Sequence, residues 1–261
     1  MLSSVRRLAG YYAASVTCMI HGFGLLPQTR RYRHLISPEL LSMTRSSRFI
    51  VSFCVGVFAW MAPSVLLPSS VLAQEAKWTS LFDGKTMDGW EKVGKDDSKW
   101  EVTDGALAGS GSASMLVCTK GPYKNFKYRA EVKINDKGNS GLYFRCTRKP
   151  SFSDGYEAQI DSTHTDPIRT GSLYGMCHVY KRVAEPDTWF TYELEVRDDV
   201  WRGKNMTRIK ITINGVELYE YLDFALTFKD GYFAFQQHDP GSKVLIRKVE
   251  VMELPEAAKK L

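Results

Sequence analysis

Side chains that could transfer protons and bind hydroxyl groups recur at alternate positions of short segments in this sequence. In the segment 156–161, the polar residues Glu157, Gln159 and Asp161 alternate with apolar ones. Successive side chains of a β-strand point to opposite faces, so these three would project from one face, with neighbours about 7 Å apart. Two carboxylates and an amide in one row can supply an acid, a base and a hydrogen-bonding group.

Two further segments, 141–146 and 233–238, repeat this alternation with other polar groups. One face of each would carry apolar side chains, with Cys146 among them. The opposite face would carry planar, cationic and aromatic groups, namely Tyr143, Arg145, Gln236 and His238. The sequence therefore predicts that the polar side chains of all three segments share one face of a sheet.

A solvated sheet face is the simpler explanation of this pattern, because antiparallel sheets often have one face in water. Solvated faces usually carry Lys, Thr and Ser, as Lys210 and Thr212 do in the segment 209–216. The three segments carry instead amides, carboxylates, a guanidinium, an imidazole and rings. Such planar groups bind sugar hydroxyls and pack on sugar faces, which favours a carbohydrate-binding hollow.

The elements that would position these groups are β-strands. From Trp78 onward, short alternating runs are separated by turn pairs such as Asp83-Gly84 and Asn214-Gly215, and helical periodicity is almost absent. Many short strands at this spacing predict an all-β, antiparallel β-sandwich, and we favour a jelly roll. The expected strands cover residues 100–102, 106–108, 115–118, 126–134, 140–146, 156–161, 173–174, 189–197, 207–213, 216–221, 232–238 and 244–253.

The positive charge of the 261-residue chain is confined to its first part. Residues 1–73 contain seven Arg and one acid, whereas residues 74–261 contain equal numbers of basic and acidic residues, although the whole chain carries a net charge of +6. A neutral body has no electrostatic reason to bind phosphate backbones, so we expect no nucleic-acid partner.

Residues 43–73 have the order of a secretory signal peptide. Arg45 and Arg48 precede an apolar stretch, and the segment closes on the small residue Ala73. We expect cleavage near Ala73 and a secreted or periplasmic protein with no stable membrane insertion. An uncleaved membrane anchor is the alternative, because the stretch is long enough to span a bilayer. Residues 1–42 are either a genuine extension or an over-long start before Met43.

Cleavage would leave residues 74–261 as a single jelly-roll domain with a frayed, charged C-terminal tail. Three cysteines remain in this domain, at Cys118, Cys146 and Cys177. An odd number permits one disulfide and one spare thiol, and three buried thiols are an equal alternative.

Ordered motifs identify a family resemblance. The segment 81–90 reads LFDGKTMDGW and resembles the LFDGKTLDGW opening of the 3-keto-disaccharide hydrolase domain family. Further matches are WEVTDG at 100–105, GNSGLYFR at 138–145, GYEAQID at 155–161, TGSLY at 170–174, ING at 213–215, FQQH at 235–238 and IRKV at 246–249. The resemblance spans about residues 78–254 and implies a concanavalin-like jelly roll, in agreement with the strand pattern.

The chain departs from the family pattern at three places. It has Asp161-Ser162, Trp189-Phe190-Thr191 and Asp239 where the family often has Leu-Asp, a Trp-Asn pair and Gly.

The resemblance implies cleavage of a glycosidic bond in a sugar that is oxidised at C3. A C3 ketone acidifies the hydrogen on C2, so a base can remove it, the C1 substituent can leave and water can add to the double bond. We expect Asp161 or Glu157 as the base, His238 as acid or base, and Arg145 as the partner of the enolate. Arg145 and His238 could instead only pair with the acids. The expected substrate-binding residues are Asn139, Tyr143, Gln159, His164, Tyr174 and Gln236.

Two further expectations concern a cofactor and a partner. Glu157, Asp161, His164 and His238 are ligand types suited to a single divalent metal, although no metal-binding spacing occurs in the sequence. A sugar oxidase could supply the ketone. The alternative function is a non-catalytic, lectin-like module that binds carbohydrate.

Overall fold

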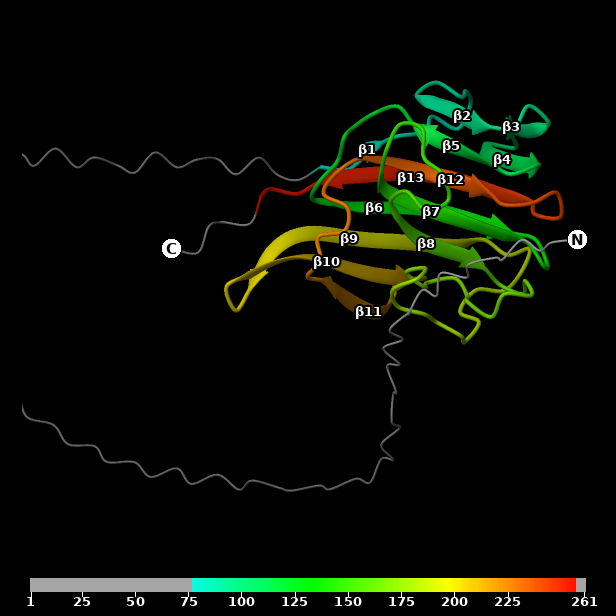
Figure 1. Cartoon of the computed structure of the whole chain (residues 1–261). Helices are drawn as coiled ribbons and strands as arrows, with labels where there is room; N and C mark the ends of the chain where they lie inside the picture. Colours follow the sequence, from blue (N-terminus) through cyan, green and yellow to red (C-terminus); the bar gives the residue numbers. More distant parts are fainter. Residues whose placement is uncertain (1–76, 257–261) are drawn as a thin grey trace, which may run out of the picture. The chain divides into compact units, whose positions relative to one another are not determined.

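The computed structural model describes residues 77–256, and over this range the chain folds into two antiparallel β-sheets that pack face to face (Figure 1). This architecture confirms the expected all-β, jelly-roll sandwich. No helix within 77–256 is long and apolar enough to cross a lipid bilayer. The predicted signal peptide, the cleavage near Ala73 and the last five residues of the tail lie outside the described residues.

The larger sheet has eight strands. They are β1 (Thr79–Ser80), β3 (Ser98–Thr103), β4 (Ala106–Gly111), β6 (Phe126–Ile134), β9 (Phe190–Trp201), β10 (Lys204–Ile213), β11 (Val216–Asp223) and β13 (Val244–Glu253). Their spatial order is β11-β10-β9-β6-β13-β4-β3, and β1 pairs with β13.

The smaller sheet has five strands. They are β2 (Trp90–Gly94), β5 (Ser114–Cys118), β7 (Asn139–Cys146), β8 (Tyr156–Asp161) and β12 (Tyr232–Gln237). Their spatial order is β2-β5-β12-β7-β8, so the three segments with polar alternation are indeed neighbouring strands.

The core lies between the two sheets and is rich in aromatic side chains. Every second residue of β6 is buried, as expected for a strand with one face toward a core. Phe126 of β6 meets Phe233 of β12 edge to face with ring centroids 4.8 Å apart, and Tyr128 packs on the same ring at 4.2 Å. Burying each such side chain contributes about 1.5–3 kcal/mol, so the core determines which residues of the smaller sheet point outward.

The hairpin between β10 and β11 confirms the prediction from Asn-Gly. Asn214 and Gly215 have φ angles of 51° and 75°, the positive values that a two-residue hairpin turn of type I′ requires. Ile209 and Ile211 are fully buried on one face of β10, whereas Lys210 on the other face is partly exposed.

The structure differs most from the expected strands at three places. β1 and β2 were not predicted, because they are short and mostly exposed and so show no apolar alternation. The segment 173–174 is not a strand, since Leu173 forms only isolated bridges with Ala158 and Cys177. β9 continues beyond the predicted end at 197 to Trp201, where it remains paired with β10.

A β-bulge in β7 reverses the predicted orientation of Arg145. Tyr232 and Ala234 of β12 pair with Cys146 and Tyr143, so β7 has one residue more than β12 over this interval. Arg145 lies in the bulge with a φ of 53°. The extra residue breaks the two-residue alternation, so the prediction that Arg145 shares a face with Tyr143 is wrong.

Arg145 instead holds loops and strands together inside the protein. Its side chain is completely buried, and its Nη2 atom lies 2.9 Å from Asp198 Oδ1. The guanidinium also donates to the carbonyl oxygens of Lys124 and Phe228 and to the hydroxyl of Thr207. These contacts use its donors fully, so Arg145 has a structural role.

The same bulge separates two of the cysteines. Cys118 is buried in the core between the sheets, whereas Cys146 is buried in a small cluster with Tyr143 and Ala234 on the outer face of the smaller sheet. The prediction that Cys146 faces the core is therefore wrong. Because Cys118 and Cys146 lie on opposite faces of the sheet, these two thiols do not form a disulfide.

We expect Arg145→Met to lower the free energy of unfolding by about 2–3 kcal/mol, because it leaves buried carbonyl acceptors without a donor and removes the buried partner of Asp198, which keeps only Thr207 and the more exposed Lys124. Urea denaturation measures this change. Arg148→Met is the matched control, since Arg148 pairs with the exposed Glu91 and should have a much smaller effect. An Arg145→Met variant that keeps the wild-type free energy of unfolding would contradict the structural role.

Candidate functional site

A pocket of about 260 Å³ lies on the outer face of the smaller sheet. β7, β8 and β12 supply its floor, and loops next to β8 supply much of its rim. The pocket is lined by Asn139, Tyr143, Phe152, Glu157, Gln159, His164, Asp166, Tyr174, Gln236 and His238. Eight of the ten site residues predicted from the sequence thus meet in one place, and the other two are Asp161 and Arg145.

Two glutamines at the floor of the pocket have amide oxygens without a protein partner. Gln159 donates from Nε2 to Asn139 Oδ1 at 3.0 Å, and Gln236 donates from Nε2 to the Tyr143 hydroxyl at 3.0 Å. The Oε1 atoms of both glutamines are buried, and neither accepts a hydrogen bond from any residue in 77–256. Because a buried acceptor without a partner is costly, these oxygens point to a ligand that brings O–H or N–H donors.

Tyr143 fixes the position of the groups around it. Its ring is fully buried, and its hydroxyl donates to the carbonyl oxygen of Phe152 at 3.0 Å while accepting the hydrogen bond from Gln236. Burial raises the pKa of Tyr143 well above its ordinary value, so the phenol stays neutral. Tyr143 therefore supports the pocket and does not exchange protons near neutral pH.

Glu157 is the carboxyl group best placed for proton transfer. It lies over Gly141 of the neighbouring strand, where a methyl group would collide with Glu157 Oε1. Burial raises the pKa of Glu157 to about 7, with the Tyr143 hydroxyl opposing the shift and the nearby Asp166 adding to it. A carboxyl group with this pKa is partly protonated near neutral pH and can serve as an acid or a base.

Two histidines and two aromatic rings occupy the rim. The rings of His164 and His238 have centroids 5.9 Å apart, and Phe152 stacks on His238 at 5.9 Å. Phe152 and Tyr174 are 39% and 44% exposed, so their faces are available to a ligand. Aromatic faces beside polar groups are typical of sites that bind ring-shaped ligands with hydroxyl groups.

The segment after β8 folds back along this strand and completes the rim. The backbone N–H of Tyr174 donates to the carbonyl oxygen of Glu157 at 2.9 Å, and that of Gln159 donates to Ser172 at 2.9 Å. The Tyr174 hydroxyl donates to Asp166 Oδ2 at 3.3 Å. These bonds hold the loop aromatic residue and the loop carboxylate at the pocket.

Asp161 does not line the pocket, which corrects its predicted role as the base. It is the last residue of β8 and is fully buried. Its Oδ1 atom accepts hydrogen bonds from the backbone N–H of His164 at 2.9 Å and from Arg169 Nη1 at 3.1 Å. Burial raises the pKa of Asp161, and the contacts with His164 and Arg169 oppose that shift. Asp161 therefore positions the loop that carries His164.

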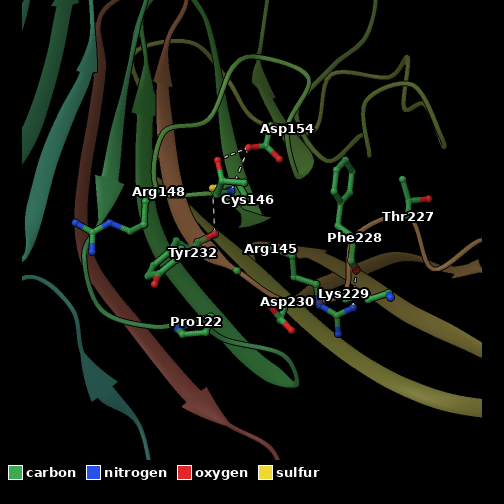
Figure 2. Close-up of a pocket in the computed structure, with 12 residues that line it drawn as sticks. Pro122, Arg145, Cys146, Arg148, Asp154, Thr227, Phe228, Lys229, Asp230 and Tyr232 are labelled. Atoms are coloured by element: carbon green, nitrogen blue, oxygen red, sulfur yellow. Dashed lines mark hydrogen bonds between the residues drawn. The ribbon is translucent and has the colours of Figure 1, made fainter.

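Arg145 lies at a second hollow, of about 520 Å³, at the other end of β7 and β12 (Figure 2). Figure 2 shows Arg145 among Phe228, Lys229 and Asp230. None of these residues lines the pocket with Glu157. Its guanidinium is bonded to the protein, and Arg148 covers the ring of Tyr232 at 5.3 Å. This hollow contains neither a histidine nor either of the unpaired glutamine oxygens, so the smaller pocket is the better candidate.

The four residues considered as metal ligands do not form a metal site in this arrangement. Within 77–256, no group of three or more His, Cys, Asp or Glu is arranged to hold a metal ion. Asp161 is engaged by Arg169 and lies outside the pocket lining. We therefore derive no step through a metal.

Phe152 and Asp166 line the pocket but were not predicted from the sequence, and neither was Arg169, which pairs with Asp161. All three lie in irregular segments, where alternation gives no signal. The polar run 162–166 directly after β8 was the available indication that this loop contributes to the rim.

Comparison with known proteins agrees with the fold. A putative glycosyl hydrolase from Parabacteroides distasonis is similar in structure, with a TM-score of 0.54 and 20% identity over 68% of this chain and 100% of that one. A carbohydrate binding module from Bacillus subtilis has a TM-score of 0.48 and 19% identity over 63% of this chain and 96% of that one.

Sequence comparison places the chain in a family. It is 34% identical over 79 residues to a 3-keto-disaccharide hydrolase from Bacteroides thetaiotaomicron, and this alignment spans 26% of this chain and 27% of that one. The model of the 3-keto-alpha-glucoside-1,2-lyase-like domain matches residues 77–252, nearly the whole described range. The chain therefore belongs to the 3-keto-alpha-glucoside-1,2-lyase-like domain family.

Proposed function

We propose that this protein cleaves the glycosidic bond of glycosides, disaccharides included, that carry a ketone at C3 of the sugar. The observation that carries the proposal is the pocket itself, where the unpaired amide oxygens of Gln159 and Gln236 lie beside two proton-transfer groups, Glu157 and His238. The family description and the name of the Bacteroides relative support this substrate class.

The proposed reaction has an elimination step and a hydration step. A base removes the proton from C2, and the electrons of the C–H bond form an enolate with the C3 ketone. The enolate then restores the ketone, forms a C1–C2 double bond and expels the C1 oxygen, which takes a proton from an acid. Water adds its oxygen to C1 while a proton returns to C2, so the net reaction is hydrolysis.

Glu157 is the proposed acid and His238 the proposed base. Because burial holds the pKa of Glu157 at about 7, this group keeps a proton near neutrality and can give it to the departing oxygen. In the hydration step the resulting carboxylate takes a proton from water, and His238 returns to C2 the proton it removed. Both groups thus regain their starting states, and an oxidase acting at C3 of a sugar would supply the substrate.

The hydroxyls of the sugar would bind at the floor and its ring at the rim. Gln159 and Gln236 accept hydrogen bonds from hydroxyl groups, and Phe152 and Tyr174 provide faces for packing. A lectin-like module would use the same contacts without turnover, so only a kinetic measurement separates the two functions.

We expect Glu157→Gln to reduce cleavage of a 3-keto-disaccharide by a factor on the order of 10²–10⁴, because glutamine cannot donate a proton to the leaving oxygen. Release of the second sugar measures the rate, and wild-type kcat/KM should fall as pH rises through about 7.

Glu217→Gln is the matched control for this variant, because Glu217 pairs with Lys210 on the larger sheet and should leave the rate unchanged. A wild-type protein that binds the sugar without cleaving it would indicate the lectin-like function.

The raised pKa of Glu157 also predicts a pH dependence of stability. Between its ordinary value of 4.5 and its folded value of about 7, the folded protein holds a proton that the unfolded chain releases. The contribution of Glu157 to stability therefore falls as pH rises through this window. Measured by urea denaturation, the stability of Glu157→Gln relative to wild type should rise from pH 4.5 to 7 and then level off, and a flat difference would contradict the buried carboxyl group.

We also propose that the chain is exported and cleaved after Ala73. N-terminal sequencing of the exported protein, made from starts at Met1 and at Met43, should then begin at Gln74. Ala73→Phe should block processing, because signal cleavage needs a small residue at this position. An exported protein that keeps the apolar stretch 49–67 would show that this stretch is a membrane anchor.

A further inference from the structure

His238 is held by a carboxylate that fixes which of its nitrogens carries the proton. Its Nδ1 atom lies 2.9 Å from Asp239 Oδ2. Asp239 is itself held, since Oδ2 accepts from the Ser242 hydroxyl at 3.0 Å and Oδ1 from the backbone N–H of Gly241 at 2.8 Å. Burial opposes ionisation of Asp239, but the hydrogen bonds from His238, Ser242 and Gly241 prevail and lower its pKa.

An ionised carboxylate can only accept hydrogen bonds, so in the neutral imidazole of His238 the proton must lie on Nδ1. Its Nε2 atom then carries a lone pair. This nitrogen forms no hydrogen bond with another residue in 77–256, and the ring lines the pocket. His238 is thus arranged to accept a proton from a ligand.

His164 is arranged in the opposite way. Its Nδ1 atom accepts a hydrogen bond from the backbone N–H of Asp166 at 3.2 Å. Because an amide N–H can only donate, Nδ1 of His164 must carry the lone pair and Nε2 the proton. Asp161 Oδ2 lies 4.0 Å from the same Nδ1, beyond hydrogen-bond distance, and Arg169 pairs with that carboxylate.

We propose that Asp239 and the backbone of Asp166 hold the two histidines as opposite tautomers, which makes His238 the base for C2 and His164 the donor to the C3 oxygen. This inference rests on the function proposed above and goes beyond it in assigning Asp239 and the His164 proton. Nε2 of His238 takes the proton from C2, the C–H electrons move into the enolate, and the negative oxygen at C3 receives the hydrogen bond from His164 Nε2–H.

The geometry of the His164 and His238 rings is compatible with these two different roles. The two imidazole planes are inclined at 71° with centroids 5.9 Å apart, so both can face one ligand without stacking on each other. Phe152 stacks on His238 with an interplanar angle of 21° and restrains the ring. The remaining charged or titratable groups that line the pocket are Glu157, Asp166 and the phenols of Tyr143 and Tyr174.

Asp239 is accordingly a positioning residue that acts through His238. Its replacement by Asn keeps an oxygen at the Oδ1 position for the contact with Gly241, but it places an NH₂ group at the Oδ2 position, where it can donate to Nδ1. The neutral imidazole would then carry its proton on Nε2 and could not remove a proton from C2.

The test combines ¹⁵N NMR of the histidine rings with kinetics on a 3-keto-disaccharide. In wild type, neutral His238 should be protonated on Nδ1 and neutral His164 on Nε2. In Asp239→Asn, His238 should shift toward the Nε2–H form, and kcat should fall about 100-fold or more with little change in KM. Thermal unfolding confirms that the variant is folded.

Asp154→Asn is the matched control, because Asp154 also accepts hydrogen bonds within its own loop, from Thr147, and these bonds involve no histidine. It should change neither the tautomers nor kcat. A wild-type His238 protonated on Nε2, or an Asp239→Asn variant with wild-type kcat, would overturn the inference. In either case, turnover by the wild type would still support the proposed function. A wild type without turnover would overturn the proposed function and the base role together, even with the expected tautomers.

Discussion

The pocket depends on the apolar inner face of β7, β8 and β12. Leu142 and Phe144 of β7 and Ala158 of β8 are fully buried between the sheets. A shift of either strand by one residue in register would expose its buried side chains. The same register places Tyr143 opposite Glu157 and Gly141 opposite Gln159 on the outer face. The hydrophobic free energy of the core therefore fixes the relative positions of polar groups that have little reason to gather by themselves.

Strand alternation predicts this part of the site well because it is a local property of each strand. Glu157, Gln159, Tyr143 and Gln236 could be assigned to one face from the sequence, since the core requires the residues between them to point inward. Arg145 shows where the rule ends. A bulge adds one residue without a clear sign in the sequence, and every side chain beyond it changes face.

The rim could not be predicted in the same way, because it is built by contacts between residues distant in sequence or irregular in conformation. The Phe152 carbonyl oxygen is held by Tyr143, and the loop after β8 is held by Asp161 through Arg169. Asp161 alternates with the buried Ala158 and Ile160 of β8 as expected for its position, but the loop after β8 folds over it and donates hydrogen bonds to its Oδ1 atom, while Oδ2 has no hydrogen-bond partner within 77–256. A strand pattern identifies the face and leaves open which groups on it remain available to a ligand.

Environment gives the titratable groups of the pocket different tasks. Burial disfavours the charge of Glu157 more than the Tyr143 hydroxyl favours it, so Glu157 holds a proton that it can give away. Asp239, on the turn after β12, receives three hydrogen bonds and stays ionised, which favours a lone pair on the far nitrogen of His238. An acid and a base can therefore coexist in one small pocket near neutral pH, because burial outweighs the contact with Tyr143 at Glu157, whereas three hydrogen bonds outweigh burial at Asp239.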